Sequence, residues 1–156
     1  MARAVRSLST SPDEDVQLVL RRALFAWLIA DGDMRLKNIA VLKISEAGKT
    51  RFSSVRIAPL YDAVTTRVFP RLERDRMALE LNGKDEHLRR ADFRIPATNA
   101  GIRSSAADQI IDSTIKLLMD DIDQVAIPKS LMLNNEAAAM ATRMLEICRE
   151  RSNSFD

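Results

Sequence analysis

The chain has 156 residues, of which 46% are apolar and 29% charged, with only 4 glycines and 5 prolines. This composition argues against a fibrous or intrinsically disordered protein, and the length suits one domain with its own hydrophobic core. The 24 basic and 22 acidic residues are interspersed and leave a net charge of +2, so no basic patch of the kind that binds nucleic acid is predicted. The longest apolar run is shorter than the ~20 residues that span a bilayer. We therefore expect a soluble, cytoplasmic protein that contacts neither nucleic acid nor membranes.

Residues 1–10 contain arginine and serine but no acidic residue, which is typical of a disordered leader or of a boundary segment outside the domain. The folded domain is expected to span residues 11–156. Its first helix begins at Ser11, where a proline follows at the first helical position and Glu14 completes a capping box, and it runs to about Ala30. Apolar side chains at helical spacing predict a buried stripe along this helix: Val16, Val19, Leu20, Ala23, Leu24, Trp27 and Leu28.

Two β-type segments follow the first helix, at residues 39–44 and 51–58, and a glycine between them suits a turn, so a β-hairpin is predicted. Residues 77–84, which include an Asn-Gly pair, predict one more short strand. The remainder has a helical pattern, with a short helix or turn expected at residues 85–94. Helices are expected from Ser104 or Ser105 to about Asp120, and at residues 134–151 beyond Pro128. These elements predict an α+β domain that is mostly α-helical and carries a small β-hairpin.

The segment DGDMRLKN, residues 31–38, places charged and amide side chains where the first helix ends. Loops held by rigid elements often carry function, so this segment is the first candidate for a site. A calcium-binding EF-hand loop is excluded, because its sixth position should be glycine and its twelfth glutamate, and counting from Asp31 these are Leu36 and Leu42. A structural alternative stays open, in which Gly32 ends the helix with a positive φ and the charged side chains are merely solvated.

The spacing within this segment also fits a phosphoryl-transfer site. Such a site needs a carboxylate to hold the attacking hydroxyl and an amide oxygen five residues later to hold magnesium. Asp33 and Asn38 have that spacing, and the cation Arg35 follows the aspartate by two residues. A second magnesium-binding aspartate should come after the strand pair, where Asp62 lies between apolar residues. The pattern predicts that Asp33, Asn38 and Asp62 converge on one cleft.

Three segments in this order and spacing resemble the C-terminal lobe of HipA-family serine/threonine kinases, which are bacterial toxin kinases: DGDMRLKNIAVL, IAPLYDAVTT and MALELNGK. The resemblance implies a protein-kinase-like C-terminal lobe that works with ATP and Mg²⁺, and it suggests an antitoxin as a partner. It implies that Asp33 is the catalytic aspartate and that Asn38 and Asp62 are magnesium ligands. It matches Lys37 to the lysine of the family's lysine-asparagine pair.

The chain departs from this family in two respects. The family usually has histidine where this chain has Arg35, whose guanidinium can neutralise a phosphoryl group in transfer or can instead pair with Asp33 and block it. In the family a preceding lobe supplies the phosphate-covering loop and the nucleotide lysine, and no glycine-rich loop is found among these 156 residues. The resemblance therefore implies that the chain alone is inactive, and that the surface such a lobe would cover could support homo-oligomers.

Two other functions compete with a kinase lobe. One is a non-catalytic, pseudokinase-like module that binds an antitoxin or a second copy of itself. The other is an unrelated helical regulator in which the motif is a coincidence. Only the kinase interpretation requires Asp33, Asn38 and Asp62 to lie together, so their positions discriminate between these functions.

Overall fold

The computed structural model describes residues 1–125, 128–132 and 135–155. The helices are α1 (Ala2–Leu8), α2 (Pro12–Leu28), α3 (Arg90–Asn99), α4 (Ser104–Asp121), α5 (Lys129–Met132) and α6 (Asn135–Asn153), and three single-turn 3₁₀ helices span Leu36–Asn38, Thr66–Val68 and Ile122–Gln124. Strands β1 (Val41–Ile44) and β2 (Ser54–Ile57) form an antiparallel pair in which Val41 lies opposite Ile57. The predicted mostly helical α+β fold with one hairpin is confirmed.

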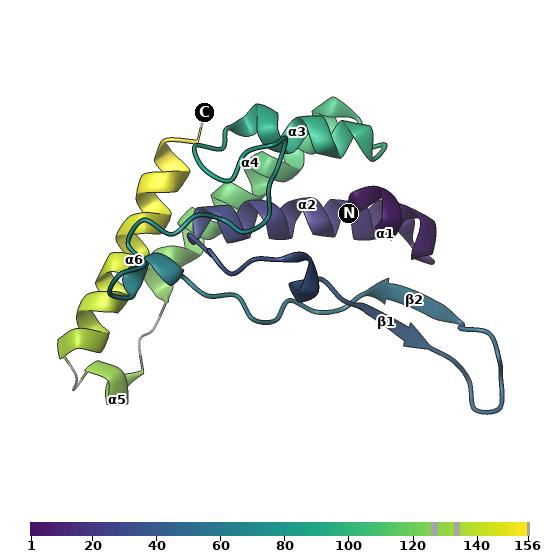
Figure 1. Ribbon diagram of the computed structural model, residues 1–156, viewed down its shortest axis with the longest axis horizontal. Coiled ribbons are helices and arrows are strands. Elements are labelled where there is room, and N and C mark those ends of the chain that lie inside the picture. Colours follow the sequence, from purple (N-terminus) through teal and green to yellow (C-terminus); the bar gives the residue numbers. More distant parts are fainter. Residues whose placement is uncertain (126–127, 133–134, 156) are drawn as a thin grey trace.

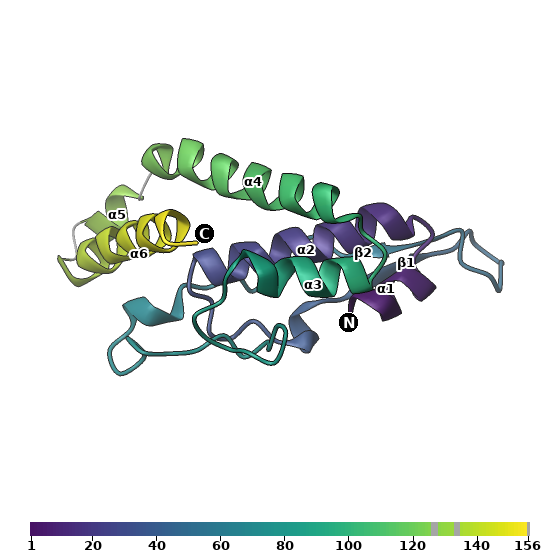
Figure 2. The ribbon, with the colours of Figure 1, turned by 90° about the horizontal axis from the view of Figure 1, so that it is seen from above.

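Helix α2 is the centre of the core. The predicted stripe is buried along its length, from Val16 at 1% exposure to Trp27 at 7%. Helices α1, α3 and α4 pack around α2, α6 lies at its C-terminal end, and the hairpin projects away from the helices (Figures 1 and 2). The helical spacing of the apolar side chains thus determined which face of α2 the rest of the domain covers.

The start of α2 differs in detail from the prediction. Ser11 is the N-cap residue, but its side chain makes no capping hydrogen bond. Glu14 does not form the predicted capping box and instead pairs with Arg56 of β2, at 2.7 Å. An arginine brought close by the fold therefore replaces the local partner that the sequence suggested.

The buried carboxylate of Asp15 fastens the hairpin to α2. Asp15 is 1% exposed and accepts hydrogen bonds from the backbone N–H of Ile57 at 2.9 Å and from Arg56 Nε at 3.1 Å. Burial raises the pKa of Asp15, but hydrogen bonds from Ser9, Ile57 and Arg56 outweigh it and hold the pKa below its ordinary value. A charged carboxylate that is fully hydrogen-bonded in this way fixes where β2 leaves the core.

The structure differs from the disordered leader expected at residues 1–10, because most of this segment is helix α1. Val5 is buried at 6% exposure, and Arg6 Nε donates to the Ala100 carbonyl at 2.6 Å. Arg6 also pairs with Asp13, at 2.7 Å. The segment is ordered because its apolar face packs on α2 and α3, a contact that its composition does not reveal.

The predicted strand at residues 77–84 is also wrong. Met77, Leu79 and Leu81 alternate with exposed neighbours as in a strand, but in the part of the chain that the structure describes no strand lies beside them. An isolated bridge joins Leu81 to Lys84. At the Asn-Gly pair the chain turns, with φ 52° at Asn82 and φ 74° at Gly83. Asp92 of α3 holds this turn, accepting hydrogen bonds from Asn82 at 2.9 Å and from Lys84 at 3.0 Å.

The described residues contain four C-terminal α-helices where three are predicted, because the short helix α5 lies between α4 and α6. Helix α3 begins at Arg90, later than expected, and continues through Pro96. Helix α6 is anchored where Arg151 lies 3.9 Å from the centre of the Trp27 ring. None of the helices in the described residues combines the length and apolarity that a membrane span requires.

Candidate functional site

The segment 31–38 leaves the C-terminal end of α2 by a turn at Ala30, which has φ 58°. The alternative in which Gly32 ends the helix with a positive φ is therefore wrong, because Ala30 adopts the left-handed conformation and Gly32 does not. Thr66 ties this turn to the next loop: its hydroxyl accepts a hydrogen bond from the Gly32 N–H at 3.0 Å and donates to the Ala30 carbonyl at 3.1 Å. The turn is thus fixed by a residue far along the chain.

Gly32 is required for space, and Gly32→Ala is expected to destabilise the fold by about 1–3 kcal/mol. A Cβ at this position would lie 1.9 Å from Asp75 Oδ2 and 2.6 Å from Thr66 Oγ1. The Asp75 carboxylate can move aside, but Thr66 is buried and hydrogen-bonded. Urea denaturation measures the change. The same cost should persist in an Asp75→Ala background, and an unchanged midpoint in both backgrounds would contradict the crowding argument.

Asp31 is a buried carboxylate beneath this segment, at 2% exposure. Its Oδ1 accepts a hydrogen bond from the Asp33 N–H at 3.0 Å. Burial raises the pKa of Asp31, and backbone hydrogen bonds from Val64, Asp33 and Met34 only partly oppose this effect. Asp31 thereby holds together the backbone on either side of the candidate site.

The raised pKa of Asp31 predicts a pH-dependent contribution to stability. The folded chain holds this proton more tightly than the unfolded chain, so the contribution is fully present below the ordinary value of 3.8 and is lost as the pH rises through the raised folded pKa. Asp31→Asn removes the titration and keeps an acceptor oxygen. The variant is expected to gain stability relative to the original chain as the pH rises, measured by urea unfolding at a series of pH values. Parallel curves of unfolding free energy against pH for the variant and the original chain would contradict this prediction.

Asp33 lies at the surface with two cations from its own loop. Its carboxylate is 36% exposed, 3.0 Å from Arg35 Nε and 3.8 Å from Lys37 Nζ. Of the two roles that the sequence left open for Arg35, the structure has it paired with Asp33. Both cations are themselves more than half exposed, and exposed ion pairs are weak, so an incoming hydroxyl can displace them.

Asn38 joins the two halves of the site. It is 3% exposed, and its Nδ2 donates to Asp62 Oδ2 at 3.1 Å and, in a longer contact, to the Asp33 carbonyl at 3.4 Å. Figure 1 shows the chain before β1 and the chain after β2 running side by side below α2. Of the three residues expected to converge, Asn38 and Asp62 are in contact through their side chains, and Asp33 adjoins Asn38 through its backbone carbonyl.

Residues outside the predicted set position Asp62. Arg22 of α2 is buried and donates through Nη2 to the Ala58 carbonyl, which fixes the chain as it leaves β2. Tyr61 donates its hydroxyl to the Lys37 carbonyl at 2.7 Å. Asp62 itself has φ 55°, a conformation that aspartate tolerates better than most residues and that often marks functional positions.

The donor atoms at this place suit a hard cation such as Mg²⁺. Among residues 1–125, 128–132 and 135–155, no group of three or more His, Cys, Asp and Glu side chains forms a cage for a metal ion. Mg²⁺ is commonly held by one or two carboxylates together with substrate phosphates and water. The carboxylate of Asp62 is a donor of this kind, and Asn38 has an amide oxygen of the same kind, although in the structure it is the amide nitrogen of Asn38 that faces Asp62.

Four residues that hold the candidate site were not predicted from the sequence: Asp31, Arg22, Tyr61 and Thr66. Asp31 had a detectable signal, because a carboxylate just beyond a helix C-terminus is disfavoured by the helix dipole unless other groups bind it. Arg22 had such a signal as well, since it and Arg21 interrupt the apolar run of residues 18–30. The contacts of Tyr61 and Thr66 depend on long-range packing, so no local sequence pattern indicated them.

Comparison with known proteins identifies the family of the chain. No curated protein matches the chain. The model of the family described as HipA-like C-terminal domain matches residues 1–122, a range that includes α1 and every residue of the candidate site. Since this match covers most of the 156 residues, the chain belongs to the HipA-like C-terminal domain family.

Proposed function

We propose that the chain is the catalytic, magnesium-binding lobe of a HipA-like serine/threonine protein kinase, which transfers the γ-phosphate of ATP to a protein hydroxyl. One observation carries the proposal: Asn38 Nδ2 lies 3.1 Å from Asp62 Oδ2, although these residues are 24 positions apart and on opposite sides of the hairpin. A solvated loop needs no such contact, whereas a kinase requires both residues beside the magnesium ions that hold the phosphates.

Each residue has a distinct role in this proposal. Asp33 orients the attacking hydroxyl and accepts its proton. Asn38 and Asp62 hold Mg²⁺, which supplies charge neutralisation at the phosphates. Arg35 and Lys37 are cations beside Asp33 and would stabilise negative charge on the phosphoryl group as it is transferred.

Binding of ATP in this proposal needs a nucleotide-binding lobe as well. Phosphoryl transfer depends mainly on positioning and charge stabilisation, so the candidate site without that lobe should turn ATP over at essentially no rate. The family resemblance further suggests that an antitoxin protein regulates the complete kinase.

Labelled γ-phosphate tests the proposal. We expect no incorporation into protein by the 156-residue chain alone, and magnesium-dependent incorporation into serine or threonine when a HipA-type nucleotide-binding lobe is supplied in cis or in trans. Removal of Mg²⁺ with a chelator should stop the reaction. Vigorous transfer by the chain alone would contradict the need for a second lobe, and no transfer by the two-lobed protein would contradict the kinase function.

Arg35→His restores the residue usual in the family and is expected to preserve or raise the activity of the two-lobed kinase. The reason is that Arg35 acts as a cation beside Asp33, and it also occupies Asp33 Oδ1 at 3.0 Å in the free chain. Arg35→Ala, which removes the cation, should lower the transfer rate by about tenfold. The rate of label incorporation measures both variants. An Arg35→His enzyme slower than Arg35→Ala would show that the guanidinium itself is required.

A further inference from the structure

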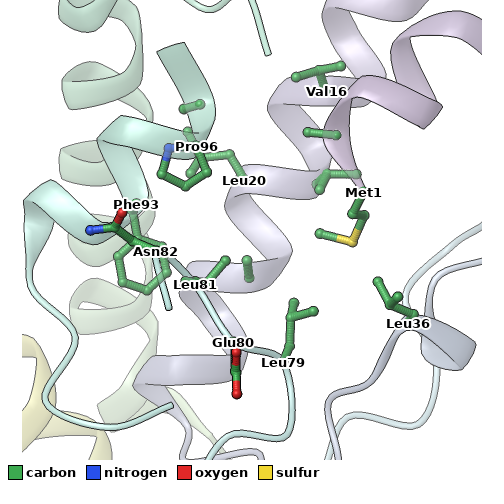
Figure 3. A pocket seen from close by; sticks show the side chains of 14 residues that line it. Met1, Val16, Leu20, Leu36, Leu79, Glu80, Leu81, Asn82, Phe93 and Pro96 are labelled. Carbon is green, nitrogen blue, oxygen red and sulfur yellow. The ribbon is translucent and has the colours of Figure 1, made fainter. Parts of the chain in front are cut away.

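An apolar recess opens beside the candidate site, between α2, α3 and the extended segment 77–81. Its volume is about 320 Å³, and its walls include Val16, Leu20, Leu36, Leu79, Leu81 and Phe93. Figure 3 shows Leu36 on one side of this opening, with Phe93 and Pro96 of α3 on the other side. Five of these walls, Val16, Leu20, Leu79, Leu81 and Phe93, are buried, so the recess is part of the packed core rather than a surface irregularity.

The recess is continuous with the candidate site. Leu36, Leu79 and Glu80 also line a shallow groove whose other walls include Arg35 and Lys37. These two cations contact Asp33, at 3.0 and 3.8 Å. A polypeptide whose hydroxyl reaches Asp33 would therefore run over this groove and arrive at the mouth of the recess.

Leu36 marks the junction between groove and recess and is unusual for its exposure. It lies between Arg35 and Lys37, yet 61% of its surface is exposed. While Leu36 is exposed between two cations, its apolar surface contributes little burial energy to the free chain. The same side chain can cover an apolar side chain of a ligand that enters the recess.

We propose that the recess holds an apolar side chain of the protein substrate, of about the size of leucine, close in sequence to the phosphorylated serine or threonine. This inference rests on the proposed kinase function. Leu36 follows Asp33 by three residues, so their Cα atoms are at most about 11 Å apart, a distance that an extended peptide covers in roughly three residues. The expected substrate therefore carries leucine or a similar residue about three positions from the acceptor hydroxyl.

Peptide binding tests the recess without ATP and so without catalysis. The probes are short peptides with a central serine and a single leucine about three residues to either side, together with the same peptides carrying lysine in place of leucine. The chain is labelled at leucine methyl groups and observed by NMR. We expect one leucine peptide to shift the signals of Leu36, Leu79 and Leu81 but not those of Leu60 and Leu117, which line a separate groove between α2 and α4. Its lysine counterpart should bind about tenfold more weakly.

Two exposed leucines provide matched variants. Leu36→Ser is expected to weaken binding of the leucine peptide about tenfold, whereas Leu117→Ser, at a position 57% exposed, should leave it unchanged. Equal binding of the leucine and lysine peptides, shifts confined to Leu60 and Leu117, or no effect of Leu36→Ser would overturn the proposal. Shifts of Leu79 and Leu81 that depend on chain concentration alone would overturn it too, because a second copy would then occupy the recess.

The two-lobed kinase separates this inference from the function on which it rests. Faster label transfer to the leucine peptide than to the lysine peptide would support the recess as a substrate site. Equal transfer to both would overturn the recess while leaving the kinase function intact. Binding in the recess with no transfer to any peptide or protein would overturn the kinase function, and with it the assignment of the occupant as substrate.

Discussion

Asp62→Asn is expected to reduce phosphate transfer by the two-lobed kinase by at least about a hundredfold. In the original chain Asn38 Nδ2 donates to Asp62 Oδ2 at 3.1 Å. The substitution keeps the shape of the side chain and an oxygen that can accept this hydrogen bond. It removes the negative charge that, in the proposed function, attracts Mg²⁺ and fixes it against the phosphates. A loss of activity without a loss of fold would therefore assign the charge, rather than the packing, of this residue to the reaction.

Asp33→Asn should cause a loss of similar size by a different route. The asparagine cannot accept the proton of the attacking hydroxyl, a contribution worth about a hundredfold to ten-thousandfold in enzymes. Raising the Mg²⁺ concentration should partly rescue Asp62→Asn but not Asp33→Asn, because only Asp62 is proposed as a metal ligand. Asp112→Asn, a 63% exposed carboxylate on α4, is the control and should retain full activity. Full activity of the Asp33 variant would rule out its catalytic assignment.

Trp27→Ala is expected to lower the free energy of unfolding by about 3–5 kcal/mol. Trp27 is 7% exposed and lies at the end of α2, next to the turn that leads into the candidate site. The Arg151 guanidinium stacks on its ring at 3.9 Å and donates to the Trp27 carbonyl. Burial lowers the pKa of Arg151 to about 10, so loss of the ring would also leave a half-buried cation with fewer partners.

The Trp27 variant should be followed by circular dichroism during guanidinium unfolding, since Trp27 is the chain's single tryptophan and its fluorescence disappears with it. Leu117→Ala, at an exposed position, should change stability by less than about 0.5 kcal/mol. A Trp27→Ala chain as stable as the Leu117→Ala chain would show that α6 and the end of α2 are held together by other contacts.

The sequence alone determined the features that depend on residues near one another in the chain. The apolar spacing of Val16, Leu20, Leu24 and Trp27 identified the buried face of α2, because a helix presents residues three and four positions apart on one side. The glycine between two β-type segments identified the hairpin. The five-residue interval from Asp33 to Asn38 identified the candidate loop, because both residues belong to one short segment.

Only the tertiary structure decided the features that depend on distant partners. Residues 77–84 have the alternation of a strand, but strand formation needs a neighbouring strand, and none of the described residues forms one beside them. Residues 1–10 look disordered by composition, yet α1 is ordered because α2 and α3 cover Val5 and bind Arg6. Likewise, Glu14 forms an ion pair with Arg56 of β2 instead of a capping hydrogen bond at the start of α2.

The same division applies to the site. Sequence spacing selected Asp33, Asn38 and Asp62, but their convergence depends on where the hairpin returns, which Asp15 and Arg22 fix through Ile57 and Ala58. The burial of Asp31 and the left-handed turn at Ala30 likewise depend on Thr66 and Val64, more than thirty residues along the chain. Local spacing specifies which side chains a segment offers, whereas the energy that brings two segments together comes from burial and hydrogen bonds made by residues outside both.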